Sequence, residues 1–329
     1  MEINKVSIIR VAWVHNYDRS LNSASGVFMY QLYDGIKNSN SEISIDLINI
    51  GSIKNPLLFI SKMIKYRKIL RGYDIIHAQY GSGTGFFVSL FNKTKIISLR
   101  GSDWYKSPAN SIKSKLHIWL GCKLTRWSLS RFNHIIVMSE SMKADVHSFA
   151  PNCKVIVIPD GIDLNRFFPK QRSTNDKFRV LFSTVNKKNP VKRYDLALSA
   201  FNLFHCKYPN SELILMTGVE PDRVNEFVNS VDVILLTSTH EGWPNIIKEG
   251  LACNIPFVST DVSDLAKIAD QTPTCYVCDA SPESLSAALE QAYFKRNEEK
   301  NLRPFVESMD KNAISLALIA LYQNVLLES

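Results

Sequence analysis

The sequence lacks several features that would place it at once in a particular class of protein. No apolar run reaches the roughly 20 residues that a membrane-spanning helix needs, and residues 1–15 do not have the layout of a secretory signal. There is no GxxxxGK[ST] phosphate loop, no HExxH motif and no Asp-x-Asp pair, and the seven histidines never stand at ligand spacing. We therefore expect a protein of the cytosol, with neither a P-loop nor a metal site.

The six cysteines are scattered along the chain and do not form the framework of a disulfide-rich domain. Such spacing is typical of reduced thiols in a reducing compartment. Cys275 and Cys278 form a lone CxxC inside the apolar run TCYVCDA. This setting favours buried strand positions over a redox or metal-binding role.

The length and the charge distribution suggest two domains with different partners. A chain of 329 residues exceeds the size at which one hydrophobic core stops growing, so two domains of roughly 150 residues are expected. Residues 1–165 hold 21 basic and 11 acidic side chains, whereas residues 166–329 hold 18 and 20. This asymmetry predicts that the N-terminal half faces an anionic partner, either a phosphorylated acceptor or an acidic membrane surface.

Two segments of the basic half place Lys and Arg beside apolar residues at helical spacing. They are KMIKYRKILR (62–71) and KSKLHIWLGCKLTRWSLSR (113–131). Either they form solvated outer faces of helices, or they contact anionic lipid. The sequence leaves both interpretations open.

Apolar strand-like runs alternate with helical patterns in both halves, which indicates parallel sheets covered by helices on both faces. We expect one domain over residues 1–165, a second over 166–303, and a last helix around 304–327 that crosses back to the first domain. Ligands of such sheets bind beyond the carboxyl ends of the strands. The residues expected at those ends in the first half are His77, Arg100 to Asp103, Ser139 and Glu140, and Asp160 and Gly161.

The stretch TSTHEGWPNIIKEGLACNIPFVSTDVSD (237–264) has the composition of a binding site. It follows the apolar run VDVILL and contains Glu241 in a loop and Glu249 in the helix that follows. Between them lie Gly242 and the helix start at Trp243, Pro244 and Asn245, where free N–H groups could meet an anion. The two carboxylates could form an acid and base pair, but their spacing favours contacts with different parts of one ligand.

A second loop of this half, VNKKNPVKRYD (185–195), crowds four bases near a helix start. They are Lys187, Lys188, Lys192 and Arg193. Because bases at a helix N-terminus oppose the helix dipole, we expect an anion such as a diphosphate to compensate them, with Lys192 as its main ligand.

A glycine-rich segment in the first half supports a different reading. GSGTG (Gly81–Gly85) follows a strand and opens a helix, and Asp103 ends the next strand. This arrangement is similar to a dinucleotide fingerprint, so a nicotinamide-dependent oxidoreductase stays an alternative. Phe86 stands where the third glycine of the fingerprint would allow close packing of helix on strand.

Taken together, the segments resemble the retaining, nucleotide-sugar-dependent glycosyltransferases of family 4, which have the GT-B architecture of two Rossmann-like domains facing across a cleft. The resemblance covers nearly the full chain and is strongest over residues 213–280, where EGWPN begins with Glu241 and is followed by Glu249. Other similar segments are Ser25-Gly26, HAQ at His77, RGSD at Arg100–Asp103, PDGID at Pro159–Asp163 and KR at Lys192-Arg193.

The resemblance implies a role for each of these positions. Lys192, with Lys187 or Arg193, would bind the diphosphate, Glu249 the ribose and Glu241 the donor sugar. Gly242, Trp243, Pro244 and Asn245 would lie near the sugar and phosphates, and Gly26 would let a loop of the first domain approach the diphosphate. His77, Arg100, Asp103 and Glu241 are the candidate catalytic residues.

Three positions depart from the family pattern. Arg100 stands where the family often has His, Lys187 or Asn186 where it has Arg, and Ser263 where it usually has Gly.

The sequence therefore predicts an enzyme that moves a hexose from a nucleoside diphosphate sugar to a hydroxyl of a growing glycan or lipid-linked acceptor. We expect retention at the anomeric carbon, no metal and no other cofactor. Polysaccharide, lipopolysaccharide or teichuronic-acid synthesis at the inner face of the cell membrane would suit such an enzyme. A non-catalytic basic module for nucleic acid or an acidic polymer is the remaining alternative, although we expect no nucleic acid as partner.

Overall fold

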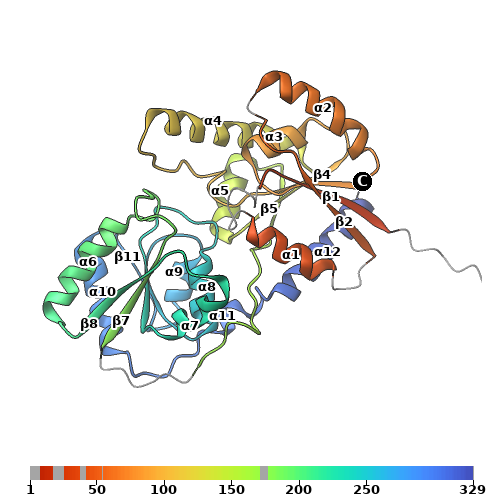
Figure 1. Cartoon of the computed structure of the whole chain (residues 1–329). Coiled ribbons are helices and arrows are strands. Elements are labelled where there is room, and N and C mark those ends of the chain that lie inside the picture. The colour runs from red at the N-terminus through yellow and green to blue at the C-terminus, as the bar shows by residue number, and fades with distance from the viewer. Residues whose placement is uncertain (1–7, 18–25, 38–41, 54, 171–176, 329) are drawn as a thin grey trace, which may run out of the picture. The chain divides into compact units, whose positions relative to one another are not determined.

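A computed structural model describes residues 8–17, 26–37, 42–53, 55–170 and 177–328 of the chain (Figure 1). The chain forms two compact units. The N-terminal unit contains Met1–Lys106, Ser111–Gly161 and Lys311–Ser329, and the C-terminal unit contains Ser107–Asn110 and Ile162–Asp310. The C-terminal segment is thus part of the N-terminal unit.

The N-terminal unit is built on a parallel sheet with strand order β2-β1-β3-β4-β5-β6. Its strands are β1 (Ile9–His15), β2 (Ile43–Asn49), β3 (Ile75–Ala78), β4 (Thr94–Ser98), β5 (His134–Val137) and β6 (Lys154–Val157). Strands β3, β4 and β5 are buried along their whole length apart from the first residue of β4. This burial explains why their sequences are continuous apolar runs.

Helices cover both faces of this sheet (Figure 1). They are α1 (Val27–Lys37), α2 (Pro56–Leu70), α3 (Ser82–Ser89), α4 (Ile112–Ser128), the 3₁₀ turn η1 (Leu129–Arg131), α5 (Glu140–Phe149) and α12 (Lys311–Leu327). Helix α1 packs against α12, and α3 packs against α4. Right-handed crossovers place α1 on one face and α2, α3 and α4 on the other.

The C-terminal unit repeats the design with strand order β11-β10-β9-β7-β8, again parallel. Its strands are β7 (Phe178–Ser183), β8 (Ser211–Met216), β9 (Val233–Leu236), β10 (Phe257–Thr260) and β11 (Tyr276–Cys278). Its helices are α6 (Tyr194–Lys207), η2 (Pro221–Arg223), α7 (Val224–Asn229), α8 (Asn245–Ala252), α9 (Leu265–Ala269), α10 (Pro282–Phe294) and α11 (Pro304–Glu307). Side chains of β7, β9, α6 and α10 form its main core.

The predicted parallel sheets are confirmed in both units, but the continuous helix expected over residues 304–327 is wrong. The segment divides into α11 and α12, with a break at residues 308–310. At the break the N–H of Ile162 donates to the carbonyl of Met309 at 2.9 Å, and Ile162 pairs with Asp310 in a parallel bridge. These contacts with a distant segment replace one turn of helix, which helical periodicity alone could not reveal.

Candidate functional site

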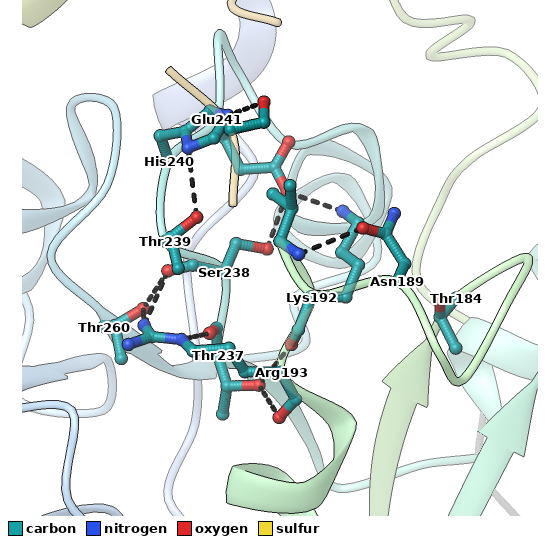
Figure 2. Close-up of polar contacts among 12 residues, drawn as sticks. Thr184, Asn189, Lys192, Arg193, Thr237, Ser238, Thr239, His240, Glu241 and Thr260 are labelled. Carbon is teal, nitrogen blue, oxygen red and sulfur yellow. Dashed lines mark hydrogen bonds and ion pairs between the residues drawn. The ribbon is translucent and has the colours of Figure 1, made fainter. Parts of the chain in front are cut away.

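In the C-terminal unit, the loop that follows β9 is tied to the turn that precedes α6 (Figure 2). Strands β7 and β9 are parallel neighbours, so the loops after them start from the same edge of the sheet. The hydroxyl of Thr237 donates to the carbonyl of Lys192 at 2.7 Å, and the N–H of Thr239 donates to the carbonyl of Val191 at 2.9 Å. The two loops therefore form one polar surface from segments about 45 residues apart in the chain.

Arg193 holds this surface together. Its backbone is left-handed, with φ of 49°, directly before α6. Its guanidinium donates to the carbonyls of Thr237 at 2.5 Å and Ser238 at 2.8 Å, and to the hydroxyl of Thr260 at 3.3 Å. These bonds give Arg193 a positioning role, whereas its predicted contact with a diphosphate stays a prediction.

Lys192 and Glu241 form an ion pair on this surface (Figure 2). The Nζ of Lys192 lies 2.5 Å from Oε1 of Glu241, and the hydroxyl of Ser238 donates to the same oxygen at 2.6 Å. The Lys192 and Glu241 side chains are 24% and 18% exposed, so both are in contact with solvent while most of their surface is buried. The Glu241 carboxylate is thus the anion beside Lys192 in this structure, and the predicted contact of Lys192 with a diphosphate stays a prediction.

Glu249 lies one turn into α8 and is partly buried. Burial raises the pKa of its carboxyl to about 7, against the opposing effects of Lys248 and Arg166. A carboxyl with a pKa near 7 is half ionised at neutral pH. Its ionised fraction rises when a ligand donates hydrogen bonds to the charged form.

The segment between the two glutamates is well packed. Gly242, Trp243 and Pro244 are buried, and Asn245 is exposed at the first position of α8. No side chain caps this helix start, and the N–H groups of Ile247 and Lys248 donate to the carbonyl of Pro244 at 3.1 Å and 3.3 Å. Ser263 donates from its hydroxyl to the carbonyl of Gly242 at 2.9 Å and has φ of 56°, the left-handed conformation in which glycine is favoured.

Lys187 and Lys188 lie in the exposed turn after β7. The Nζ of Lys187 is 5.3 Å from the centre of the Tyr194 ring, over which it can share a cation–π contact. Of the four bases in this loop, Lys192 thus lies beside Glu241, and Arg193 is bound to backbone carbonyls.

In the N-terminal unit, His77 belongs to a buried network. Its Nδ1 lies 2.6 Å from the hydroxyl of Tyr322, and its Nε2 lies 2.9 Å from the hydroxyl of Ser98. The indole N–H of Trp13 donates to the same Tyr322 oxygen at 2.7 Å. Because an indole only donates, this set is satisfied when Tyr322 donates to Nδ1 and Nε2 carries the proton toward Ser98.

Burial lowers the pKa of His77 to about 3, with a further contribution from Arg100. The imidazole is therefore neutral throughout the physiological range. As a candidate catalytic residue, His77 can hydrogen-bond or polarise a group, but it does not supply a proton from an imidazolium.

Arg100 follows β4 and lies in a small pocket lined by Leu32, His77, Gln79, Ser98, Arg100, Ile136, Ile158, Pro159, Asp160 and Leu318. Its guanidinium pairs with Asp160, donates to Oε1 of Gln79 at 3.2 Å and lies 4.2 Å from the centre of the Phe28 ring. Nε2 of Gln79 and Nε of Arg100 are buried without a hydrogen-bond partner among the described residues. Buried donors without a protein partner are usually satisfied by ordered water or by an oxygen of a ligand.

Asp103 is fully buried and binds backbone. It accepts hydrogen bonds from the N–H groups of Gly81 at 2.7 Å, Arg100 at 2.9 Å and Gly101 at 3.0 Å. These bonds join the RGSD loop to the start of α3. These hydrogen bonds give Asp103 a structural role, and the catalytic role expected for it stays a prediction.

The same contacts argue against the nicotinamide alternative. The N–H groups at the start of α3 are bound by the Asp103 carboxylate and, at Ser82, by the Thr125 hydroxyl at 2.7 Å. A side chain at Gly81 would come within 2.6 Å of that hydroxyl, and one at Gly85 within 2.6 Å of Ile97. Gly81 and Gly85 therefore serve internal packing, and the N–H groups of Gly81 and Ser82 are already bound to side chains of the chain itself.

Gly26 precedes α1 with φ of 69°, and a Cβ there would come within 2.7 Å of the Tyr17 ring. The close approach explains the glycine. Ser25, the other half of the predicted loop, lies outside the described residues.

Three residues of these sites were not predicted from sequence. Tyr322 is 245 positions from His77, and no spacing pattern signals their contact. Ser238 precedes Glu241 by three residues in a loop rich in hydroxyls, so only its place in the fold distinguishes it. Gln79 stood in the HAQ motif without being singled out, and the motif does not show that its Oε1 accepts from Arg100 while its Nε2 lacks a partner among the described residues.

Neither a metal cluster nor a membrane span is found where the structure describes the chain. Its His, Cys, Asp and Glu side chains do not gather in groups of three or more that could hold an ion. None of the helices within these residues is both long and apolar enough to cross a bilayer.

Comparison with known proteins gives concordant results for both halves. Residues 31–166 match the family described as Glycosyltransferase Family 4, and residues 180–294 match Glycosyl transferases group 1. An uncharacterized glycosyltransferase of Methanocaldococcus jannaschii is 21% identical over 251 residues. That match covers 63% of this chain and 62% of the relative, so the chain spans under two thirds of its length.

Solved structures resemble the whole chain. Sucrose-phosphate synthase of Thermosynechococcus elongatus has a TM-score of 0.71 at 16% identity, covering 98% of this chain and 100% of that one. Anabaena HepE in complex with UDP and glucose has a TM-score of 0.68 at 12% identity, covering 96% and 99%. At these identities the likeness establishes the fold. From the two family matches and the two parallel-sheet units, we conclude that the chain belongs to glycosyltransferase family 4 and has the GT-B fold.

Proposed function

We propose that the chain transfers a hexose from a nucleoside diphosphate sugar to a hydroxyl of a growing glycan, with retention at the anomeric carbon. The observation that carries the donor half of this proposal is the Lys192–Glu241 pair at the edge of the β7 and β9 strands. UDP in the HepE structure and in a structure of Staphylococcus aureus TarM supports a nucleotide donor.

The ion pair suits a donor site because each of its charged groups can exchange its partner for a part of the donor, Lys192 for the diphosphate and Glu241 for the sugar. The diphosphate competes for the Lys192 ammonium, which then leaves the Glu241 carboxylate to accept hydrogen bonds from sugar hydroxyls. Ser238 keeps the carboxylate in place during this exchange. In the free protein the ion pair also avoids the cost of a partly buried charge that has no partner.

Two further features fit the rest of the donor. The uncapped start of α8 offers N–H groups and a positive dipole end to the departing diphosphate. Glu249, with its pKa raised to about 7, gains a stable ionised form when ribose hydroxyls donate to it. Fixed cations and backbone dipoles thus stabilise the leaving group without a requirement for metal in this proposal.

The pocket around Arg100 in the N-terminal unit is proposed to bind a polar group of the acceptor. Its buried unpaired donors, on Gln79 and Arg100, call for an oxygen ligand such as a sugar hydroxyl. We name no covalent nucleophile.

A thermal-shift panel of UDP, GDP, ADP and CMP sugars tests the donor class. The matching donor raises the melting temperature of the wild type, and calorimetry gives its affinity. Lys192→Ala should weaken binding about 10-fold to 100-fold, since a charge-assisted phosphate contact is worth roughly 1.5–3 kcal/mol. Lys188→Ala, on the same exposed turn, is the matched control and should bind normally.

Activity completes the test. With the donor identified, NMR of the product shows the anomeric configuration, and an assay in excess EDTA shows whether metal is required. No stabilisation by any nucleotide sugar, or equal loss in Lys188→Ala and Lys192→Ala, would contradict the proposed donor site.

A further inference from the structure

Two helices of the N-terminal unit expose an unusual amount of apolar surface. Half of the large apolar side chains exposed in the described chain lie on α2 and α4. On α2 they are Leu57 (78%), Leu58 (53%), Ile60 (57%), Ile64 (71%) and Ile69 (41%), and on α4 they are Ile112 (86%), Leu116 (61%), Trp119 (46%), Leu120 (48%) and Trp127 (47%). Scattered exposed apolar residues are normal, but a concentration on two helices marks an interaction surface.

The two helices belong to one layer of the fold (Figure 1). The ring of Phe59 on α2 lies 5.9 Å from that of Phe86 on α3, and Phe86 lies 5.2 Å from Trp127 on α4. Helix α3 also packs along α4. These aromatic contacts fix α2 and α4 against α3. Trp127 takes part in them while staying 47% exposed, and the other nine apolar residues are exposed without appearing in these contacts.

The same surface is basic and carries no acidic residue. The sequence has no Asp or Glu from Gly51 to Tyr73 or from Trp104 to Ser139. Within these stretches α2 and α4 expose Lys65, Arg67, Lys68, Lys113, Lys115 and Lys123. Two basic side chains lie over tryptophan rings of α4: Lys123 is 5.8 Å from the Trp119 ring centre, and Arg131, in the η1 turn after α4, is 3.6 Å from that of Trp127.

We propose that α2 and α4 form a docking surface for an anionic phospholipid bilayer, into whose headgroup region the exposed Leu, Ile and Trp side chains insert. An anionic bilayer offers negative charge and an apolar interior together. It therefore binds surfaces on which lysines stand beside aliphatic side chains and tryptophans. A nucleic acid would attract the Lys and Arg side chains, but it gives the exposed leucines and isoleucines no apolar environment. The charge and the apolar surface together therefore select lipid.

The proposal is independent of the donor chemistry, and its test uses the full chain without any sugar nucleotide. Sedimentation is measured with vesicles of phosphatidylcholine alone and of phosphatidylcholine mixed with phosphatidylglycerol, which gives the vesicles the negative surface potential of a charged leaflet. The wild type should sediment with the anionic vesicles only, with a blue shift of tryptophan fluorescence. Raising the salt concentration should weaken but not abolish a contact that is partly apolar.

Two variants separate the two contributions. Lys65→Gln/Lys68→Gln/Lys113→Gln should lower the partition coefficient about 100-fold, since each base near an anionic surface contributes roughly a fivefold gain. Ile64→Ser/Ile112→Ser/Leu116→Ser should lower it at least about tenfold, because each side chain loses its transfer into the interface. All six positions are exposed, so circular dichroism and melting should match the wild type.

Control variants change exposed residues elsewhere on the chain. Lys170→Gln/Lys207→Gln/Lys267→Gln removes the same charge, and Leu203→Ser/Phe294→Ser/Leu316→Ser removes exposed apolar side chains. Both should bind vesicles as the wild type does.

Four results would overturn the proposal. They are no sedimentation with anionic vesicles, equal losses in variants and controls, tighter binding to single-stranded DNA than to vesicles, and a dimer in light scattering that the apolar variant abolishes. The last two would assign the surface to an acidic polymer or to a second copy of the chain.

Discussion

The raised pKa of Glu249 makes donor binding depend on pH in a direction that can be worked out. With a pKa of about 7, the carboxyl is about 9% ionised at pH 6 and about 91% ionised at pH 8. Ribose hydroxyls donate hydrogen bonds, so they favour the ionised form, which accepts at both oxygens. We therefore predict that affinity for the nucleotide sugar rises about tenfold from pH 6 to pH 8 and then levels off.

Calorimetric titration of the donor across this range measures the effect directly. A nucleotide sugar is the right probe because its substituted diphosphate keeps its charge between these pH values. Glu249→Gln should bind more weakly than the wild type at pH 8 and show no dependence on pH. His240, which also lies near the pair, has a pKa lowered by burial from 6.5, so His240→Gln should keep the dependence.

Protein stability supplies an independent check on the pKa. Because the folded state holds the Glu249 proton more tightly than the unfolded state, the contribution of this group to stability is present at pH 4.5 and is lost as the pH rises to 7. A shift from 4.5 to about 7 corresponds to about 3 kcal/mol, or roughly 1–3 kcal/mol for a partly exposed group. In urea denaturation, Glu249→Gln should be more stable than the wild type at pH 8 by that amount.

The two measurements distinguish the possible errors. A wild type whose stability falls with pH but whose donor affinity does not change would refute the ribose contact and leave the pKa intact. If Glu249→Gln showed the same pH profiles as the wild type, the reasoning from burial would be wrong.

Three further predictions concern residues that hold the sites in place. Asp103→Asn should lower the free energy of unfolding by about 1–3 kcal/mol in urea titration, because the NH₂ group of the asparagine replaces a carboxylate oxygen that accepts from backbone N–H groups. Unchanged stability would show that these loop hydrogen bonds are dispensable. Tyr322→Phe should cost a similar amount and alter Trp13 fluorescence, since the indole N–H and His77 Nδ1 both lose their partner; an unshifted spectrum would argue against the network. Ser263→Gly should be more stable in thermal denaturation than Ser263→Ala by about 1 kcal/mol, because both lose the bond to the Gly242 carbonyl but only glycine relieves the left-handed backbone; the reverse order would contradict this account.

The fold was predictable to a large extent because its signals are local. Buried parallel strands are continuous apolar runs, as in β3 and β9, and the intervening helices have their own start signals. The break between α11 and α12 was not predictable, since it depends on the bridge between Ile162 and Asp310, far apart in the chain. Local periodicity carries no information on such pairings.

The candidate site was predictable by residue type but not by contact. The sequence singled out Lys192, Arg193 and Glu241 as polar residues at strand ends. It predicted a diphosphate contact for both bases, which stays a prediction, and gave no sign that Lys192 pairs with Glu241 or that Arg193 binds backbone carbonyls. These internal contacts form because a free protein satisfies its half-buried charges internally.

By itself, the sequence determined the alternation of strands and helices, the division into two parallel-sheet domains, the acid-free basic stretches and the motif that holds Glu241 and Glu249. Only the tertiary structure decided which of these side chains meet. It brought Tyr322 to His77, joined Asp103 to the start of α3, and left the apolar sides of α2 and α4 uncovered. Hydrophobic periodicity is written into neighbouring residues, but hydrogen bonds, burial and the pKa of Glu249 depend on segments that the chain brings together only when it folds.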